Sequence, residues 1–427
     1  MTDQALTRAE AARLDIEDKL SSFRERFYIP DGTLYFDGNS LGLLSKDAEA
    51  SVQRALDAWK TYAIDGWTKG PEPWFHLPET LGGLSAPLVG ALPSEVIVSG
   101  STTVNLHTLL ATFYRPTGTR TKILADRENF PSDLYAMHSH IQLHGRPDED
   151  LVLIEPDENG LMSEQTIIDA MQDDIALILL PSVWYKSGQL ADIRLLTEAA
   201  HARGIVIGFD LAHSIGALPH ELHDIGVDFA VWCNYKYVNS GPGATAGLYV
   251  HERHHDKAPG LAGWFGSDKD RQFDMAFPLT PARSASKWQL GTPPILATAA
   301  IAASLKMLHE ADITAIRAKS LQQTSYLRKL LTHFVIDADL GGNIRTPIED
   351  SRRGGHIAFE HEDAVQLAKA LRVEGVVPDF RPPYTLRFAP APLYTSYQDI
   401  YDAVMIISDL LKTGRHHAYS KERDVVS

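Results

Sequence analysis

Hydrophobic positions in the central part of the chain follow two spacings, one typical of strands and one typical of helices. Short runs that are apolar throughout predict buried strands at residues 95–100, 121–126, 151–155, 175–182, 205–210 and 228–233. Amphipathic stretches predict helices at residues 47–62, 103–114, 131–144, 162–171 and 195–204. Strands without a polar face that alternate with helices are typical of a parallel sheet covered on both sides. We therefore expect an α/β fold with a mostly parallel central sheet.

The pattern changes after about residue 296, where long helical stretches begin. Strands are predicted there at residues 356–360 and 384–390, and helices at residues 364–375 and 396–413. This arrangement predicts a smaller C-terminal α+β domain. The expected organisation has three parts: an N-terminal segment near the small domain and the active-site entrance, a large α/β domain, and the small domain, at residues 1–45, 46–295 and 296–427.

Composition narrows the possible partners. The chain has 427 residues, of which 44% are hydrophobic and 22% charged, as in an ordinary globular protein. Its 40 basic and 55 acidic residues give a net charge of −15, which argues against a nucleic-acid or anionic-membrane partner. The N-terminal residues lack the apolar core of a signal peptide, and no stretch reaches the roughly 18 apolar residues of a membrane span. We expect a cytoplasmic enzyme.

Cysteine and histidine usage gives no prediction of a metal site. Cys233 is the single cysteine, so an intramolecular disulfide and a thiolate-built metal site are both excluded. Cys233 lies in an apolar strand and is expected to be a buried, inert thiol. The run HERHHD (251–256) contains three histidines, but neighbouring histidines in a loop seldom converge on one ion. We expect no bound metal.

Candidate chemistry appears where two predicted strands end. Asp210 closes the strand of residues 205–210, His213 follows it, and Lys236 comes shortly after the next strand. Ligands of parallel sheets bind at the carboxyl ends of strands, so these side chains should share one crevice. A carboxylate can keep a heterocyclic nitrogen protonated, and a desolvated lysine can form a Schiff base with an aldehyde, as pyridoxal phosphate requires. Asp210 as a helix cap and Lys236 as a solvated charge remain open alternatives.

Two further segments fit a phosphate group and an aromatic ring. Gly100 to Thr103, including Thr102, lie between a strand and a helix, where backbone N–H groups favour an anion. The segment NFPSD (129–133) follows another strand and supplies Phe130 for stacking, Ser132 as a donor, and Asp133. Both segments also fit plain helix starts, with Ser or Thr as the cap and Pro131 in the first turn.

Together these segments resemble the kynureninase family, whose members use pyridoxal phosphate on the aspartate aminotransferase fold (fold type I). DLAH is shared with cysteine desulfurase-like relatives, whereas CNYKY, GWFG and RFAPAPLY are more particular to kynureninases. The resemblance runs from near residue 35 to near residue 400. The matching segments are YFDGNSLG (35–42), TTVNLH (102–107), NFPSD (129–133), GFDLAH (208–213), GVDFAVWCNYKYVNSGPG (226–243), GWFG (263–266), TPPIL (292–296) and LRFAPAPLYTSYQD (386–399).

The resemblance implies a role for each matching residue. Lys236 would carry the Schiff base, Asp210 would pair with the pyridinium nitrogen, and Tyr235 would serve as the acid/base of later proton transfers. Arg387 would hold the substrate carboxylate as a bidentate pair. The remaining cofactor-binding residues would be Thr102, Thr103, Phe130, Pro131, Ser132, Asp133, His213 and Tyr235, with Trp264 and Thr292 supplied by the second subunit of a homodimer. Asn39 and Ser40 would lie in a loop close to the substrate.

Three positions depart from the family's pattern. Pro181-Ser182 replaces a region where relatives can offer a hydroxyl to the cofactor, so Ser182 receives no role. Thr292 stands where some relatives have asparagine, and Trp67 where some have histidine. These last two positions line the aromatic substrate pocket of the family and bear on specificity.

The implied activity is hydrolytic Cβ–Cγ cleavage of L-kynurenine to anthranilate and L-alanine, with 3-hydroxykynurenine a poorer substrate. The resemblance associates this reaction with the kynurenine pathway; tryptophan catabolism, NAD biosynthesis and formation of a secondary metabolite stay open as its physiological role. One alternative is a cysteine desulfurase or selenocysteine lyase, which needs a nucleophilic cysteine well downstream of the lysine; Cys233 precedes Lys236 instead. A second alternative is a non-catalytic regulator on the same fold, which the retention of Lys236, Asp210 and Arg387 disfavours.

Overall fold

The computed structural model describes residues 6–423, and its largest element is a seven-stranded sheet with the order β2-β8-β7-β6-β5-β3-β4. Strands β4, β3, β5, β6 and β7 run parallel to one another, whereas β8 pairs antiparallel with both β7 and β2. The strands are β2 (Val96–Val98), β3 (Lys122–Asp126), β4 (Leu151–Ile154), β5 (Ile175–Pro181), β6 (Val206–Asp210), β7 (Phe229–Trp232) and β8 (Gly247–Val250).

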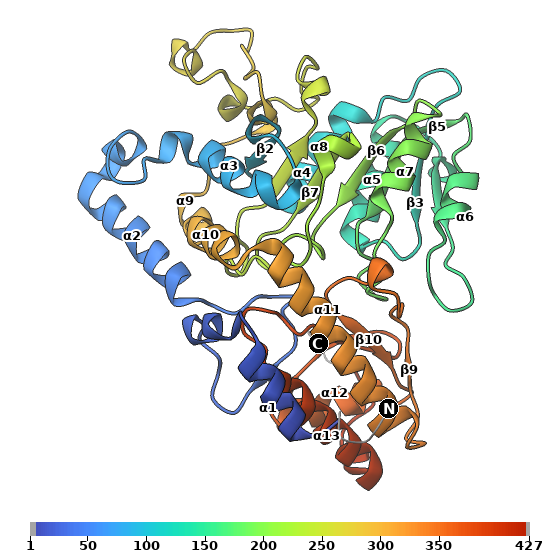
Figure 1. The fold of residues 1–427 in the computed structure, drawn as a ribbon. Helices are drawn as coiled ribbons and strands as arrows, with labels where there is room; N and C mark the ends of the chain where they lie inside the picture. Colours follow the sequence, from blue (N-terminus) through green and yellow to red (C-terminus); the bar gives the residue numbers. More distant parts are fainter. Residues whose placement is uncertain (1–5, 424–427) are drawn as a thin grey trace.

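Both faces of this sheet are buried, as the continuous apolar runs predict (Figure 1). Leu177 and Leu179 of β5 join one core with helices α4 and α5, while Ile178 and Leu180 join another with α3, α7 and α10. Alternation along a strand therefore feeds two separate cores. The helices of the large domain are α2 (Lys46–Tyr62), α3 (Leu77–Val89), α4 (Thr102–Phe113), α5 (Pro131–Leu143), α6 (Glu164–Asp169), α7 (Ile193–His201), α8 (Leu222–Ile225), α9 (Ile295–Thr298) and α10 (Ile301–Ala311).

The smaller domain contains a four-stranded antiparallel sheet with the order β12-β13-β10-β9. Its helices cover that sheet around a third core (Figure 1). A short parallel pair, β1 with β11, joins the N-terminal segment to it. The elements are α1 (Arg8–Glu17), β1 (Leu34–Tyr35), α11 (Ile313–Leu331), β9 (Asn343–Ile344), β10 (Ile357–Glu360), α12 (Ala364–Val373), β11 (Val376–Val377), β12 (Asp379–Arg381), β13 (Thr385–Phe388) and α13 (Tyr397–Thr413).

The N-terminal segment packs on the small domain. Arg8 of α1 forms an ion pair with Asp402 of α13 at 2.9 Å, and Asp15 accepts a 2.6 Å hydrogen bond from the Tyr397 N–H. Residues 1–5 and 424–427, the outermost parts of the expected segments, lie outside the described residues.

The distribution of buried side chains bears on the expected boundary at residue 296. Helix α10 and Ile316 of α11 pack in the core of the large domain, and the core of the small domain begins at Tyr326. Because α11 contributes to both cores, we propose that the boundary lies within this helix.

No helix among residues 6–423 is both long and apolar enough to cross a membrane.

Candidate active site

Lys236 and Asp210 lie together at the carboxyl edge of the large sheet. Asp210 is the last residue of β6, and Lys236 follows β7 by four residues in a turn. Asp210 pairs in register with Val231 of the neighbouring parallel strand, so both strands end at the same level. Only 9% of Lys236 and 8% of Asp210 is exposed. A buried amine beside a buried carboxylate is the arrangement that the sequence predicts.

His213 holds the amine of Lys236. The Nζ atom of Lys236 lies 3.1 Å from Nε2 of His213. Burial, and then the charge of Lys236, hold the pKa of His213 well below its usual value, so the ring is neutral. Nε2 therefore accepts a hydrogen bond from the amine. The other ring nitrogen, Nδ1, is buried without a protein partner.

Asp133 and Asp210 form a coupled pair of carboxyl groups. Burial, followed by repulsion from Asp210, raises the pKa of Asp133 well above its usual value. Burial also raises the pKa of Asp210, but the charge of Lys236 and the N–H of Ala212, which donates to Asp210 Oδ1 at 2.8 Å, oppose this shift. The shared proton therefore resides on Asp133, and Asp210 is the ionised member.

An aromatic wall closes one side of this cluster. The ring of Phe130 lies 5.8 Å from Lys236 Nζ and is 39% exposed. It meets the ring of Tyr185 edge-on at 5.4 Å. Tyr185 was not identified from the sequence, because it lies in a loop after β5 and no pattern distinguishes it from other loop aromatics. Pro131 sets the first turn of α5, which directs Phe130 and Asp133 toward the cluster.

The start of α4 presents unpaired backbone donors. Asn105 N–H makes the first helical bond, to the Ser101 carbonyl, and the Ser101 hydroxyl accepts from Val104 N–H at 3.4 Å. The N–H groups of Thr102 and Thr103 precede these bonds, as expected of a helix start that receives an anion. Gly100 enters the turn with φ +60°, and a Cβ there would lie 2.6 Å from Asn105 Oδ1.

The remaining residues near the lysine support the turn or the strand ends. Tyr235 is partly buried, and its carbonyl accepts a 2.8 Å hydrogen bond from Gly42 N–H. Burial raises the pKa of Tyr235, and the neighbouring Cys233 adds to the shift. Ser132 donates to Asp133 Oδ1 at 3.4 Å. Ser182, left without a role, donates to the Asp210 carbonyl at 3.0 Å and so supports the end of β6.

Arg387 lies in β13 with its side chain 1% exposed. Its guanidinium pairs with Asp379, and Nη1 donates to the Tyr185 carbonyl at 3.0 Å. Nη2 also donates to the Ser40 hydroxyl at 3.2 Å. Arg387, which is expected to hold the substrate carboxylate, is therefore anchored by the carboxylate of Asp379. It also contacts the loop that carries Ser40. Asn39, next to it, is fully buried, and its side-chain amide has no protein partner.

Trp67 and Trp264 occupy a separate aromatic cluster. The ring of Trp67 lies 5.9 Å from that of Phe265, which lies 5.6 Å from that of Trp264. Within residues 6–423, neither tryptophan makes a ring contact or hydrogen bond with Lys236, Asp210 or His213. Thr292 is exposed. We call this group the aromatic cluster; its members are Trp67, Trp74, Phe75, Trp264, Phe265 and Phe273.

Two of the three histidines of residues 251–256 pair with different carboxylates, and His255 lies 3.1 Å from the Val250 carbonyl. His254 and Arg253 pair with Asp228, at 2.7 Å for His254. His251 lies 3.5 Å from Glu95, which also receives His223 at 3.0 Å. The group of Glu95, His223 and His251 has the composition of a metal site.

The cluster around Lys236 fits pyridoxal phosphate. Asp210 is an ionised carboxylate that can face a ring nitrogen, and Phe130 offers a ring face beside the amine. The buried atoms without protein partners include Asp133 Oδ2 and His213 Nδ1, the polar groups that a bound ring and its substituents would satisfy. The helix start at Thr102 supplies donors for a phosphate.

Curated relatives decide the family. A kynureninase of Bacillus anthracis is 52% identical over 98% of this chain and 97% of its own length, and one of Geobacillus thermodenitrificans is 52% identical over the same shares. A kynureninase of Shouchella clausii is 50% identical over 100% of this chain and 99% of its own. The chain belongs to the kynureninase family. The family profile described as the kynureninase C-terminal domain also matches residues 316–407.

Solved structures confirm the fold-type-I architecture predicted for this kynureninase family member. A cysteine desulfurase from Thermococcus onnurineus superposes with a TM-score of 0.78 over 92% of this chain and 98% of its own, at 17% identity. A C-DES mutant with glycine covalently linked to its PLP cofactor gives 0.76 over 90% of this chain and 99% of its own, at 14% identity. At such identities the likeness concerns the fold alone, and the desulfurase alternative is not favoured.

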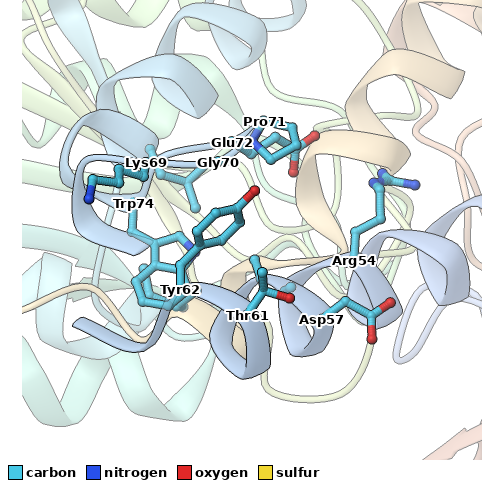
Figure 2. A pocket seen from close by; sticks show the side chains of 13 residues that line it. Arg54, Asp57, Thr61, Tyr62, Lys69, Gly70, Pro71, Glu72 and Trp74 are labelled. Atoms are coloured by element: carbon cyan, nitrogen blue, oxygen red, sulfur yellow. The ribbon is translucent and has the colours of Figure 1, made fainter. Parts of the chain in front are cut away.

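A pocket beside α2 lies apart from this cluster (Figure 2). Its volume is about 250 Å³, and Figure 2 shows Tyr62 and Trp74 on one side with Arg54 and Glu72 on the other. None of Lys236, Asp210 and Arg387 lines it. It lacks a buried amine and a phosphate-binding helix start, so it is not a second candidate for the reaction.

Proposed function

We infer that the protein is a pyridoxal-phosphate-dependent kynureninase that hydrolyses L-kynurenine to anthranilate and L-alanine. The observation that carries this function is the buried group of Lys236, Asp210 and His213 at the carboxyl edge of the sheet, in a chain 52% identical to curated kynureninases. The reaction breaks the bond between the β- and γ-carbons of kynurenine. Water supplies the hydroxyl of the carboxyl group that forms on anthranilate.

Each residue of the cluster has a proposed part in proton handling. Pyridoxal phosphate, when bound, supplies an electron sink that stabilises negative charge on the substrate's carbons. Lys236 would hold the cofactor through its amine, and its Nζ would remove the α-proton of the substrate. His213, neutral because burial lowers its pKa, keeps that amine in place by accepting its hydrogen. Asp210, beside the charge of Lys236, would keep a proton on the ring nitrogen of the cofactor.

Tyr235 is the proposed acid of the later proton transfers. Because burial raises its pKa, the phenol keeps its proton at neutral pH and can donate it before it accepts one. Thr102, Thr103, Ser132 and Tyr235 are the proposed phosphate ligands, with the α4 start as the main anion site.

Arg387 is the proposed partner of the substrate carboxylate. Asp379 and the Tyr185 carbonyl fix the plane of its guanidinium, which reduces the entropy that binding must overcome. A guanidinium has five N–H donors. The substrate carboxylate can accept hydrogen bonds from one N–H of Nη1 and from the N–H of Nη2 that now donates to Ser40. Ser40 and Asn39 then lie at the rim of the substrate site.

A homodimer is proposed because the aromatic cluster is not joined to Lys236 within one chain. Trp264 is 44% exposed, and the following segment exposes Phe273 (65%), Met275 (70%) and Phe277 (98%). Apolar side chains exposed to this extent and grouped in one segment are typical of an interaction surface. In the proposed dimer this segment packs on a second copy and brings Trp264, Thr292 and Trp67 to the partner's site. A cytoplasmic location and a place in tryptophan catabolism and NAD biosynthesis stay predictions from the resemblance.

The test is direct. Cofactor-loaded protein is incubated with L-kynurenine, and anthranilate and alanine are measured in equal amounts by fluorescence and amino-acid analysis. Lys236→Ala should reduce kcat to less than about 1% of wild type, because Lys236 supplies the one amine beside Asp210 in residues 6–423. Equal turnover by this variant, or no anthranilate from the wild type, would contradict the proposed function.

A further inference from the structure

We propose that Asp363, His416 and His417, which are separate from the residues around Lys236, form a binding site for one divalent metal ion of the Zn²⁺ class. His416 and His417 lie in the short helix η13 (Arg415–Ala418), which follows α13 and packs against α12. Asp363 is the residue immediately before α12. Figure 1 shows α12 and α13 together in the small domain.

The two histidines converge on one carboxylate oxygen. Asp363 Oδ2 lies 3.3 Å from Nε2 of His416 and 3.2 Å from Nε2 of His417. Four ligands placed 2.0–2.1 Å from Zn²⁺ in a tetrahedron are about 3.3 Å from one another. The observed separations therefore match two edges of such a tetrahedron. The group borders a hollow of about 810 Å³, which leaves a fourth position open to water.

The hydrogen bonds of His416 suit a metal ligand. Its Nδ1 atom lies 2.9 Å from the Leu410 carbonyl, which can only accept, so Nδ1 carries a hydrogen. Nε2, the other ring nitrogen, faces Asp363 Oδ2 at 3.3 Å and is the atom that would bind an ion held between them. Donation of the second ring nitrogen to a carbonyl is the usual support of a metal-binding histidine, and this ring is only 3% exposed.

Asp363 is also directed toward the histidines rather than toward its helix. An aspartate directly before a helix usually accepts a hydrogen bond from the first turn. The side chain of Asp363 makes no such bond. Its own N–H donates to His361 Nδ1 at 3.0 Å, which fixes the backbone while the carboxylate faces η13. Lys421 approaches the other oxygen, Oδ1, at 3.8 Å and leaves Oδ2 to the histidines.

Two imidazole nitrogens and one carboxylate oxygen, with an open fourth position, suit Zn²⁺ among the common divalent ions. The ion would join the end of α13 to the start of α12 and stabilise the C-terminal part of the small domain.

The group of Glu95, His223 and His251 is a weaker candidate. Glu95 already accepts the N–H groups of Leu92 (2.9 Å) and Glu252 (2.8 Å), and His251 Nδ1 accepts that of Arg253 (3.2 Å).

The experiment uses the full chain without an affinity tag, loaded with cofactor and stripped of metals by a chelator. ZnCl₂ is titrated by calorimetry, and Tm is measured with and without Zn²⁺. We expect the wild type to bind one ion per chain at this site at micromolar Zn²⁺ and to gain about 2 °C or more in Tm. His417→Gln, a change at a 59% exposed side chain, should lose that ion and the gain in Tm while keeping the metal-free Tm.

His223→Gln is the matched control and should retain both the ion and the gain in Tm. Asp363→Asn should behave as His417→Gln does, because an amide oxygen is a poorer ligand. The proposal is overturned if the wild type takes up no Zn²⁺, if His417→Gln binds as well as the wild type, or if His223→Gln alone loses the ion. Cleavage of kynurenine should be unchanged in His417→Gln, so the outcome does not depend on the proposed function.

Discussion

At the scale of single residues, the two carboxyl groups beside the lysine have different tasks that the sequence did not separate. Asp133 and Asp210 share one proton, and the charge of Lys236 keeps Asp210 ionised. A buried pair of like charges settles in this way because ionising both is too costly. In the proposed cofactor site, the pair would present one anion to the ring nitrogen and one neutral acid that can donate a hydrogen bond.

Asp210→Asn should lower kcat by roughly 10²-fold or more while the cofactor remains bound, because an amide cannot hold a proton on the ring nitrogen. Asp133→Asn is the matched control. Asparagine resembles the protonated acid that Asp133 already is, so this variant should keep at least about a tenth of kcat. Steady-state kinetics and cofactor absorbance measure both. Equal losses in the two variants would show that Asp210 has no special role.

Trp67 and Thr292 are predicted to set the preference between kynurenine and its 3-hydroxy derivative. A pocket that hydrogen-bonds a hydroxyl discriminates strongly, whereas an apolar pocket discriminates weakly. Where some relatives have histidine and asparagine, Trp67 and Thr292 fill the space that a 3-hydroxyl group would need and offer fewer polar groups to hydrogen-bond it. We expect kcat/KM to be about tenfold or more higher for L-kynurenine. The double variant Trp67→His with Thr292→Asn should shift the preference in kcat/KM toward 3-hydroxykynurenine. Equal turnover of both substrates by the unmodified enzyme would show that these two residues do not set the preference.

At the scale of elements, the start of α4 illustrates how a turn prepares a binding site. The chain leaves β2 and turns through Gly100, whose left-handed φ of +60° lets α4 begin at Thr102, directly after the strand. A side chain there is strained by the backbone and also meets Asn105. The position of the helix start, and with it the phosphate site, depends on this glycine.

Gly100→Ala should raise the Kd for pyridoxal phosphate by about tenfold, because the first turn of α4 must shift to relieve the contact, and a shift worth 1.4 kcal/mol is tenfold in affinity. Gly118→Ala is the control, since Gly118 has a φ of +55° but open space around its Cβ position. That variant carries the backbone cost alone and should bind the cofactor as the wild type does. Titration of the apoenzyme followed by fluorescence measures both, and identical Kd values would contradict the assignment.

At the scale of the whole molecule, the site is proposed to be complete only in a pair of chains. Lys236, Asp210 and Arg387 come together within one chain. Trp264 and Trp67 belong instead to the aromatic cluster, which is partly exposed. A two-fold dimer joins the same surface of both copies, so each site receives the partner's aromatic residues.

Mixing two defective variants tests this arrangement. Lys236→Ala and the double variant Trp264→Ala with Thr292→Ala should each be nearly inactive. After unfolding and joint refolding, half of the dimers are mixed, and each mixed dimer contains one intact site, which restores about a quarter of wild-type activity. Activity that stays at the sum of the separate variants would place all these residues in one subunit's site or outside it.

Much of the fold and the chemistry follows from the sequence itself. Apolar runs of four to eight residues specify buried parallel strands because both faces of such a strand are covered. The strands expected at 205–210 and 228–233 form as β6 and β7, and parallel strands end at one edge, which brings Asp210 and Lys236 together. The short strand β8 escaped prediction because its four residues carry no period and its antiparallel pairing depends on the distant partners β2 and β7.

Tertiary structure alone decided the charges and partners of the site. The pKa values of Asp133 and Asp210 depend on burial, on the charge of Lys236 and on the N–H of Ala212, and Asp379 is the partner of Arg387 because β12 and β13 pair. Tyr185 entered the site because the loop after β5 passes between Phe130 and Arg387. Asp363 and His416 lie 53 residues apart and meet only because α13 returns along α12. Burial and long-range contacts fix these features, and a local pattern of residues carries neither.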